Sequence, residues 1–443
     1  MRVLMLGWEF PPHISGGLGT ACHGITKGLL GKGAEIVFVL PSLRAVPQKS
    51  DGFLRSASGV SITRGLRQAV DRIRREWEYK NLPGLDAHPI DSNLTPYGQS
   101  SGFTSRSIDP ELLDASLQSV EEVSHFHGGY QKDLMDEVER FSAAATAVVL
   151  EEHRKRHADV IHAHDWMTYP AAIAASRLCG LPLVVHLHAT EYDRCGEIGY
   201  DKIYRIEREG LHAADHVIAV SKRTKQIAVE RYGVPPDKIS VVYNGVFPLA
   251  HPPVFNIPKL IRHEKRVLFM ARVAMQKGPD YFVEAARLVL DALPDTRFIL
   301  AGNGDLLPRM IRRAAELRMG SRFHFPGFMR GEDVRHMYSM ASLYVMPSVS
   351  EPFGIAPLEA LQCGAPVLMS KQSGSAEVLP SAFTVDFWNV KEMADTIINI
   401  LNYPEMAAAS LRLCQQELKL LTWERAADGI LNVYARVCPK ARS

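Results

Sequence analysis

Residues 3–19 read VLMLGWEFPPHISGGLG, and this stretch decides how the chain begins to fold. Its first four residues form an apolar run of strand length, and the loop Ser15-Gly16-Gly17-Leu18-Gly19 then opens a stretch of helical period. Glycine leaves backbone N–H groups free to approach an oxyanion at the positive end of the helix dipole. The loop lacks both the full G-x-G-x-x-G pattern and the lysine of a P-loop. Two interpretations therefore stay open: a phosphate site, and a turn needed only for tight packing.

The same alternation of short apolar runs and helical stretches continues along the chain, as in a parallel sheet covered by helices on both faces. It therefore predicts an α/β fold of two doubly wound, Rossmann-like domains. The first series of predicted strands comprises residues 3–6, 36–40, 160–162, 183–187, 216–220 and 239–243. The second series comprises residues 266–270, 297–301, 323–325, 343–346 and 366–369, with helices such as 281–292 between them.

The length of 443 residues and the 46% hydrophobic composition also suit two cores better than one. Four prolines between Pro248 and Pro258 prevent a helix there, so we place a linker at about 246–261. We expect one domain over 1–250, with an insertion at about 44–130, and a second over 262–422. Within the insertion, a predicted helix over 64–78 carries five arginines, which we interpret as a solvated face.

Composition and charge exclude several classes of protein. The 51 Lys and Arg residues nearly balance the 49 Asp and Glu residues, so no global field attracts nucleic acid or an anionic membrane. Six cysteines without a Cys-x-x-Cys pair argue against a disulfide scaffold or a zinc ribbon. No segment approaches the roughly 18 apolar residues of a membrane helix, and the first run is too short for a signal peptide. We expect a cytoplasmic protein without stable membrane insertion.

A pair of cations follows the first strand of the second series. Arg272 and Lys277 are five residues apart on a strand-to-helix loop, so both side chains can reach a diphosphate. Metal-dependent sugar transferases commonly hold their metal with Asp-x-Asp, and this sequence contains no such triplet. Arg272 and Lys277 taken alone fit a surface position equally well. If they do bind a diphosphate, we expect no metal and no other cofactor.

The most informative motif is PSVSEPFGIAPLEAL at residues 347–361. Glu351 lies on the loop after a predicted strand, and Glu359 lies two turns into the following helix, on its cleft-facing side. Carboxylates accept hydrogen bonds from vicinal hydroxyls, so Glu351 can hold a sugar and Glu359 a ribose. The backbone N–H groups of Gly354 and Ile355 lie between them and can approach phosphate. A capping or solvated role would suit one glutamate alone but not the whole run.

Two histidine pairs end predicted strands of the first series, in His162-Ala163-His164-Asp165-Trp166 and His186-Leu187-His188. Ligand crevices of open parallel sheets lie outside this edge. Alternating histidines on a strand face one side and could ligate a metal, although one of each pair may equally be a satisfied core residue. We favour an interpretation without metal, in which Asp165 and His188 contact sugar hydroxyls or the bridging oxygen.

Together these residues resemble the retaining glycosyltransferases of the two-domain GT-B fold. The resemblance is closest to the family four enzymes with their glycogen and starch synthase relatives, and it covers nearly the whole chain. It rests on Gly-Gly-Leu at 16–18, His-Asp-Trp at 164–166, Tyr-Asn-Gly at 243–245, Arg272 with Lys277, Gly-Asn-Gly-Asp at 302–305, Pro-Gly-Phe at 326–328 and the two glutamates.

The resemblance implies a role for each part of the chain. The domain over 1–250 would face a carbohydrate acceptor, the domain over 262–422 would bind a nucleotide diphosphate sugar, and a helix within 423–443 would cross back to the first domain. Asp165 and His188 would line the acceptor side near the transferred sugar, while Gly16 and Gly17 would lie near the donor diphosphate. The other implied contacts are Arg272 and Lys277 to the diphosphate, Glu351 to the donor sugar and Glu359 to the ribose.

The resemblance favours transfer of glucose from ADP-glucose or UDP-glucose to an α-glucan. Bacterial glycogen synthases usually carry Lys before the Gly-Gly-Leu loop, whereas Ser15 precedes Gly16 here and His13 is the nearest polar alternative. Three alternatives stay open: a lipid-linked or cell-envelope glycan as acceptor, a metal-dependent hydrolase using the histidines, and a binding protein without turnover. The sequence gives no indication of the oligomeric state.

Overall fold

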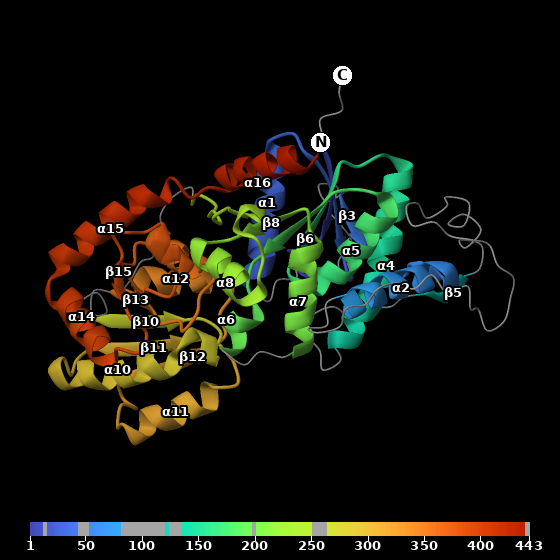
Figure 1. Ribbon diagram of the computed structural model, residues 1–443. Coiled ribbons are helices and arrows are strands. Elements are labelled where there is room, and N and C mark those ends of the chain that lie inside the picture. The colour runs from blue at the N-terminus through green and yellow to red at the C-terminus, as the bar shows by residue number, and fades with distance from the viewer. Residues whose placement is uncertain are drawn as a thin grey trace, which may run out of the picture.

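The computed structural model describes residues 1–11, 16–42, 53–80, 120–123, 134–196, 201–249 and 264–438. The described residues form two α/β bodies that lie side by side, the first built from the N-terminal half of the chain and the second from the C-terminal half (Figure 1). None of the described helices is both long and apolar enough to span a bilayer. The predicted linker at 246–261 lies largely outside the described residues.

The first body is built on a fully parallel sheet of order β3-β2-β1-β6-β7-β8-β9. The order of the strands in the sheet reverses between β1 and β6, so that position is a topological switch point. The strands are β1 (Arg2–Leu6), β2 (Glu35–Leu40), β3 (Leu54–Ser56), β6 (Val160–His164), β7 (Leu183–Leu187), β8 (His216–Ala219) and β9 (Ile239–Val241).

Successive residues of these strands point to opposite faces of the sheet. Leu4 and Leu6 of β1 pack on the face covered by α4 (Leu134–Lys155) and α5 (Tyr169–Cys179). Val3 and Met5 pack on the face covered by α1 (Gly17–Gly31) and α16 (Trp423–Val437). Both faces are apolar, as expected of strands that are covered on both sides.

The second body repeats the plan with a parallel sheet of order β12-β11-β10-β13-β14-β15 and a switch point between β10 and β13. Its core lies in two layers, one on each side of the sheet. The strands are β10 (Arg266–Met270), β11 (Arg297–Ala301), β12 (Phe323–Gly327), β13 (Leu343–Met346), β14 (Val367–Ser370) and β15 (Phe383–Val385). The covering helices are α10 (Pro279–Ala292), α11 (Leu307–Glu316), α12 (Glu332–Met340), α13 (Ile355–Gln362), α14 (Val390–Asn402) and α15 (Pro404–Leu418).

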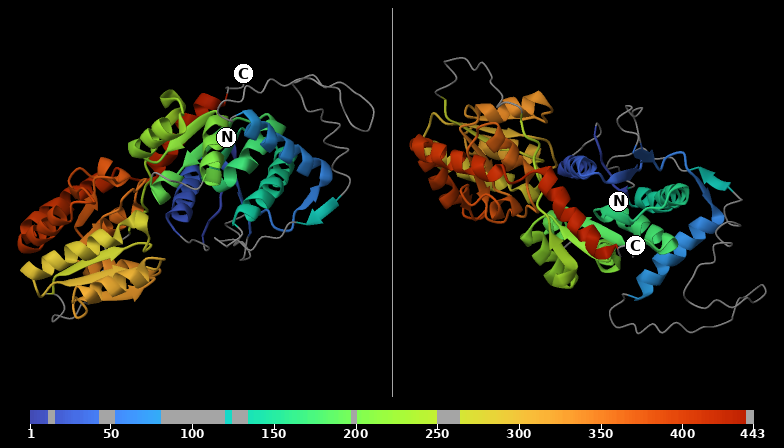
Figure 2. Two further views of the ribbon diagram at one scale, coloured as in Figure 1. Left: turned by 60° about the horizontal axis from the view of Figure 1, so that its bottom comes forward. Right: turned by 90° about the horizontal axis from the view of Figure 1, so that it is seen from above.

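The last helix, α16, leaves the second body and lies along α1 of the first (Figure 2). Thr422 caps it by accepting a hydrogen bond from the Arg425 amide at 3.3 Å. A Cβ on Gly24 of α1 would lie 2.0 Å from the indole ring of Trp423, so only glycine lets the two helices approach this closely. Helix α16 is thereby part of the first core.

The remaining described elements flank the first sheet. They are α2 (Arg64–Lys80), the antiparallel pair β4 (Ser61–Thr63) and β5 (Val120–Val123), α6 (Glu191–Cys195), α7 (Asp201–Ala213) and α8 (Lys222–Tyr232). In α2, Leu66, Val70 and Ile73 are buried, whereas Arg64, Arg67, Arg72 and Arg75 are exposed. The solvated face is therefore confirmed for these four arginines, whereas Arg74 is half-buried and pairs with Glu139.

The predicted α/β class and the two doubly wound sheets are confirmed, and every predicted strand is present with an end shifted by two residues at most. Four strands were missed, namely β3, β4, β5 and β15. Each has only three or four residues, which is too short to show a period. The pairing of β4 with β5 also shows that part of the insertion at 44–130 has regular structure.

Candidate active site

The predicted site residues follow strands at the carboxyl edges of the two sheets. Gly16 and Gly17 come after β1, Asp165 after β6 and His188 after β7. In the second sheet, Arg272 and Lys277 follow β10, and the loop that carries Glu351 follows β13. Both sets lie at or next to a switch point, where open α/β sheets bind their ligands.

Lys277 and Glu351 are brought together by a close approach of two loops. Lys277 ends a short 3-10 helix, η4 (Met275–Lys277), and Gly278 follows with a φ of 66°. A Cβ on Gly278 would lie 2.0 Å from the carbonyl oxygen of Pro347, so a side chain there would force the loops apart. The Lys277 Nζ atom lies 2.5 Å from Glu351 Oε2, and the Ser348 hydroxyl donates to the same oxygen at 3.3 Å.

This ion pair is largely shielded from water. The Glu351 side chain is 8% exposed and the Lys277 side chain is 21% exposed. Opposite charges attract strongly at this distance, and low exposure reduces screening by salt. Lys277 is therefore a fixed, charged donor, and Glu351 a fixed acceptor, at the carboxyl edge of the second sheet.

Arg272 differs from Lys277 because its side chain is exposed. Among the described residues, no carboxylate forms an ion pair with it, although the second body contains many Arg–carboxylate pairs. A guanidinium that forms no ion pair with a described residue, next to a switch point, keeps its donors available for an anion.

The amino end of α13 is held against the first body. Gly354, with a φ of 89°, precedes the helix, and Ile355 opens it. The Ile355 side chain packs against both the second core and the α1–α16 layer of the first core. The first amides of a helix have no acceptor within it, so this turn can donate to an anion, as the sequence predicts.

Glu359 lies one turn further along α13 and is half-buried. Burial raises the pKa of its carboxyl to about 7, and the positive charge of Arg335 acts against this rise. A carboxyl poised near neutrality can change charge when a ligand or the solution changes its surroundings.

Asp165 is held in a strained backbone conformation, with φ 59° and ψ 168°. Its Oδ1 atom accepts hydrogen bonds from the amide of His188 at 2.7 Å and from that of Ala189 at 3.4 Å. The side chain therefore fixes the loop that carries His188. Burial raises the pKa of Asp165 to about 7 and lowers that of His188 to about 3.

Hydrogen bonds join this loop to Ser350, the residue before Glu351, across the boundary between the bodies. Thr190 and Asp193 form a capping box at the start of α6. The free carboxylate oxygen of Asp193, Oδ1, accepts a 2.5 Å hydrogen bond from the hydroxyl of Ser350. Ser350 immediately precedes Glu351, so the acceptor-side loop and the donor-side ion pair share one connected network.

A second set of contacts crosses the same boundary beside the first. The guanidinium of Arg223 donates to Ser350 Oγ at 3.0 Å. Glu377, from the second body, accepts from the amides of Lys222 and Arg223 at the start of α8 at 2.9 and 2.8 Å, and from the Tyr243 hydroxyl at 3.0 Å. The structure thus shows the two bodies closed onto each other at the Glu351 loop.

The glycine loop is the least constrained part of the site. Gly16 and Gly17 are exposed, and a Cβ on either would meet no atom within 4 Å. No steric reason within the described residues therefore requires glycine at these two positions. Ser15 and His13, which differ from the pattern of bacterial glycogen synthases, lie outside the described residues.

Sequence reasoning assigned no role to Asp193, Arg223 or Glu377, and it quoted Ser350 only as part of a motif. The spacing Thr190-x-x-Asp193 is a helix-start signature that could have located Asp193 at the first turn of a helix. Arg223 and Glu377 are far apart in the chain, so only the packing of the two bodies reveals their role.

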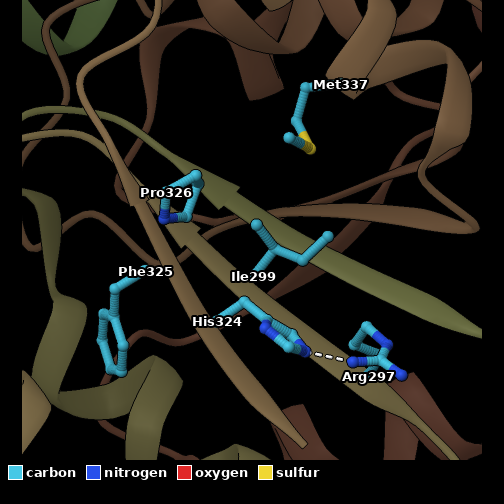
Figure 3. Close-up of a pocket in the computed structure, with 6 residues that line it drawn as sticks. All are labelled: Arg297, Ile299, His324, Phe325, Pro326 and Met337. Atoms are coloured by element: carbon cyan, nitrogen blue, oxygen red, sulfur yellow. Dashed lines mark hydrogen bonds between the residues drawn. The ribbon is translucent and has the colours of Figure 1, made fainter.

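A groove of about 340 Å³ lies over β11 and β12 and is separate from these residues (Figure 3). Arg297 and His324, whose side chains contact each other there, lie in the amino-terminal halves of their strands. The site residues occupy the opposite ends of the strands. The groove is lined by Arg297, Ile299, His324, Phe325, Pro326 and Met337, none of which the sequence predicted for the site.

Two family models match the chain and together cover most of both bodies. The model of glycosyltransferase family 4 matches residues 110–248, and the model of glycosyl transferases group 1 matches residues 255–410. The second match contains Arg272, Lys277, Glu351 and Glu359. The first contains Asp165 and His188.

Curated relatives and solved structures agree with these models. An uncharacterized glycosyltransferase of Methanocaldococcus jannaschii is 27% identical, covering 86% of this chain and 83% of its own. A glycogen synthase of Mycobacterium tuberculosis is 24% identical, covering 98% of this chain and 94% of its own.

Among solved structures, Anabaena HepE in complex with UDP and glucose superposes with a TM-score of 0.65. It is 18% identical, and the match covers 98% of this chain and 100% of that one. A likeness at this identity establishes the fold. With two parallel Rossmann-like sheets and both family models matched, the chain belongs to the family four glycosyltransferases of the GT-B fold.

Proposed function

We propose that this glycosyltransferase moves glucose from ADP-glucose or UDP-glucose to an α-glucan, with retention of the anomeric configuration and without a metal ion at the diphosphate. The observation that carries the proposal is the Lys277–Glu351 pair on the loop that also carries exposed Arg272, joined through Ser350 to the loop of His188. This arrangement supports a site that combines cations, a carboxylate for sugar hydroxyls and a neutral imidazole.

The cations suit the leaving group. When the bond from C1 of the sugar to the diphosphate breaks, negative charge grows on the diphosphate. Arg272 and Lys277 are positioned to bind that charge, the first through its unpaired guanidinium and the second through an ammonium group already fixed by Glu351. Fixed charges need no reorganisation during the reaction, so they can take the role that a metal plays elsewhere.

The acceptor attacks from the same side. Its hydroxyl oxygen forms the new bond to C1 on the face that the diphosphate leaves, and its proton passes to a diphosphate oxygen. This route needs no strong base and no covalent enzyme intermediate. His188, neutral because burial lowers its pKa to about 3, contacts the sugar as a hydrogen-bonding group, and Asp165 positions it through the backbone.

The choice of glucose and glucan rests on likeness. The M. tuberculosis glycogen synthase aligns over nearly the whole chain, and the HepE structure holds UDP and glucose in the same fold. Glu351 is a suitable acceptor for donor-sugar hydroxyls, and the Glu359 carboxylate for ribose hydroxyls.

The test is release of nucleoside diphosphate by chelator-treated protein, with ADP-glucose, UDP-glucose, GDP-mannose and UDP-N-acetylglucosamine each assayed with and without glycogen. We expect turnover of one glucose donor that requires glycogen and survives chelation. Lys277→Ala should lower it severely, whereas Lys391→Ala, at an exposed lysine paired with Asp395, should not. Turnover that requires added Mg²⁺ would contradict the mechanism, and glycogen-independent turnover of another donor would contradict the substrates.

A further inference from the structure

Four histidine rings, three from β6 and β7 and one from His188 just after β7, stack beside one another. His162 and His164 are two residues apart on β6, and His186 of β7 lies opposite His164, so all three point to the same face. Their neighbours on that face are Val160 and Val184, which pack in the α1–α16 layer. The exposed fractions of the three residues are 0%, 0% and 1%.

The ring nitrogens of these residues are only partly satisfied. His162 Nδ1 lies 2.6 Å from the hydroxyl of Tyr434 on α16, and His164 Nδ1 lies 3.0 Å from His188 Nε2. Among the described residues, His162 Nε2, His164 Nε2 and both nitrogens of His186 have no partner. A buried polar atom without a partner destabilises a fold, so a cluster of such atoms indicates an occupant.

We propose that His162, His164 and His186 form a buried binding site for one divalent transition metal, which we assign as Zn²⁺. One ligand atom from each side chain lies within 4.8 Å of the other two. Zn–N bonds of about 2.0–2.1 Å in tetrahedral geometry separate nitrogens by roughly 3.4 Å, so modest ring rotations complete the site. Three imidazoles with one open position are a donor set that Zn²⁺ takes in proteins.

The outer contacts match those of a metal site. A histidine ligand usually donates its second ring N–H to a fixed acceptor, which orients the ring. Tyr434 is positioned to orient the ring of His162 in this way, and His188 the ring of His164. The metal would thus join β6 and β7 beneath α16, at the point where the C-terminal helix packs onto the first sheet.

Buried carboxylates are available to offset the charge of the ion. Asp165 follows His164 directly, and Asp165 and Glu9 both lie close enough to Cys22 for their charges to act on its thiol. Cys22 in turn lies within ligand distance of His164 and His188. Ionisation of a buried carboxyl this close to the trio would offset part of the charge of a divalent ion, which an apolar core could not hold alone.

A second arrangement, Cys22 with His164 and His188, also brings three ligand atoms within 4.8 Å. We favour the histidine trio because it uses the nitrogens that lack partners. The other trio draws on His188, whose Nε2 atom already pairs with His164. The site departs from the sequence-based expectation of no metal. It is distinct from the diphosphate cations Arg272 and Lys277, so the proposed transfer chemistry does not depend on it.

The test loads the chelator-treated full-length protein with Zn²⁺, removes free metal and measures zinc per chain by mass spectrometry. We expect about one zinc per chain, and at least a tenfold loss of bound zinc in His186→Phe, because a site with two ligands binds weakly. His216→Asn is the matched control, since His216 lies on β8 outside the cluster and bonds Ser240. Loading with Co²⁺ should give the visible absorption of a tetrahedral complex in the wild type and in His216→Asn, but not in His186→Phe.

A second readout is thermal unfolding, because a ligand that binds only the native state raises the unfolding midpoint. Zn²⁺ should raise it for the wild type and for His188→Asn, but not for His186→Phe or His162→Phe. A wild-type protein without stoichiometric zinc would overturn the proposal, as would retention of zinc in His186→Phe. Loss of bound zinc in His188→Asn, with zinc retained in the other variants, would overturn the assignment of ligands. If His186→Phe does not fold, the wild-type zinc content and Co²⁺ spectrum decide the matter.

Discussion

The carboxyl edges of the two sheets have the same topology, but the first carries buried groups and the second carries charged ones. At the first edge, burial keeps His188 neutral, with a pKa of about 3, and raises the pKa of Asp165 to about 7. At the second edge, Lys277 and Glu351 form an ion pair at 2.5 Å, and Arg272 is exposed. A doubly wound sheet thus fixes where a ligand binds, and the side chains on the loops determine whether a charged or a neutral ligand binds there.

This contrast assigns the two halves of the reaction to the two bodies. The donor brings a diphosphate that gains charge as it leaves, which requires cations. The acceptor brings neutral hydroxyls, for which polar but uncharged groups are sufficient. If the division holds, a substitution at one edge should leave the function of the other edge unaffected.

Loss of Lys277 should have the largest effect. We predict that Lys277→Ala lowers kcat/KM by about 10²–10³-fold, because a cation that stabilises the leaving diphosphate contributes roughly 3–4 kcal/mol. It should also destabilise the fold by about 2 kcal/mol, since Glu351 is left with an unpaired buried charge. Kinetics and denaturant unfolding measure the two effects.

The pair Lys277→Met with Glu351→Gln separates these effects. The double variant should regain most of the stability, because no unpaired charge remains, while activity stays low. Recovery of activity with stability would mean that the pair serves the fold rather than the diphosphate.

Arg272 provides the sharpest contrast with Lys277. Because its side chain is exposed and forms no ion pair with a described residue, Arg272→Ala should leave the unfolding free energy unchanged. Activity should fall by about 10–100-fold, the equivalent of one or two charge-assisted hydrogen bonds. Arg322→Ala, which removes a surface pair with Asp295, should change neither quantity. Full activity in Arg272→Ala would exclude this guanidinium from the donor site.

Ser350 tests the connection between the two edges. Ser350→Ala removes the hydrogen bonds to Asp193 and Arg223, so the closed arrangement should weaken. We predict a fall in kcat of about tenfold with little change in nucleotide affinity, because closure assembles the site but each edge stays intact. The control is Ser381→Ala, whose lost bond to Glu417 lies within the second body. A loss of nucleotide affinity as large as the loss of kcat would place Ser350 in the donor site itself.

Glu359 gives the smallest effect and a pH dependence. Its pKa is raised to about 7, so the folded protein holds a proton between about pH 4.5 and 7 that the unfolded chain releases. The stability contribution of this group therefore falls as pH rises through that window. Donor affinity should move in the opposite direction, rising a few-fold from pH 6 to 8 as the carboxylate forms.

The variant Glu359→Gln checks this assignment. It should bind donor with little change between pH 6 and 8 and be more stable than the wild type at pH 8, because no charge is buried. An unchanged pH profile in this variant would show that another group controls donor affinity.

The fold was largely predictable because its strands are buried on both faces and appear as continuous apolar runs, such as residues 183–187. Short edge strands such as β15 were not predictable, since three residues carry no period. The positions of Arg272, Lys277 and Glu351 followed from motif spacing and strand order. Their mutual geometry did not, because the contact depends on how closely Gly278 lets two loops approach.

The network across the boundary was also beyond sequence reasoning. The bond between Ser350 and Asp193 spans 157 positions of the chain, and no local pattern encodes a contact of that range. The histidines show the same limit. Their alternation predicted a shared face, but which nitrogens lack partners depends on Tyr434, which arrives from the last helix.

The most direct test of the division between the two edges is calorimetric binding of UDP and ADP to three variants, measured beside transfer activity. Arg272→Ala and Lys277→Ala should each weaken binding of the nucleotide that the wild type prefers by at least about tenfold. His188→Ala should bind that nucleotide as the wild type does and yet lose transfer. Loss of nucleotide binding in His188→Ala, or its retention in both cation variants, would contradict the account.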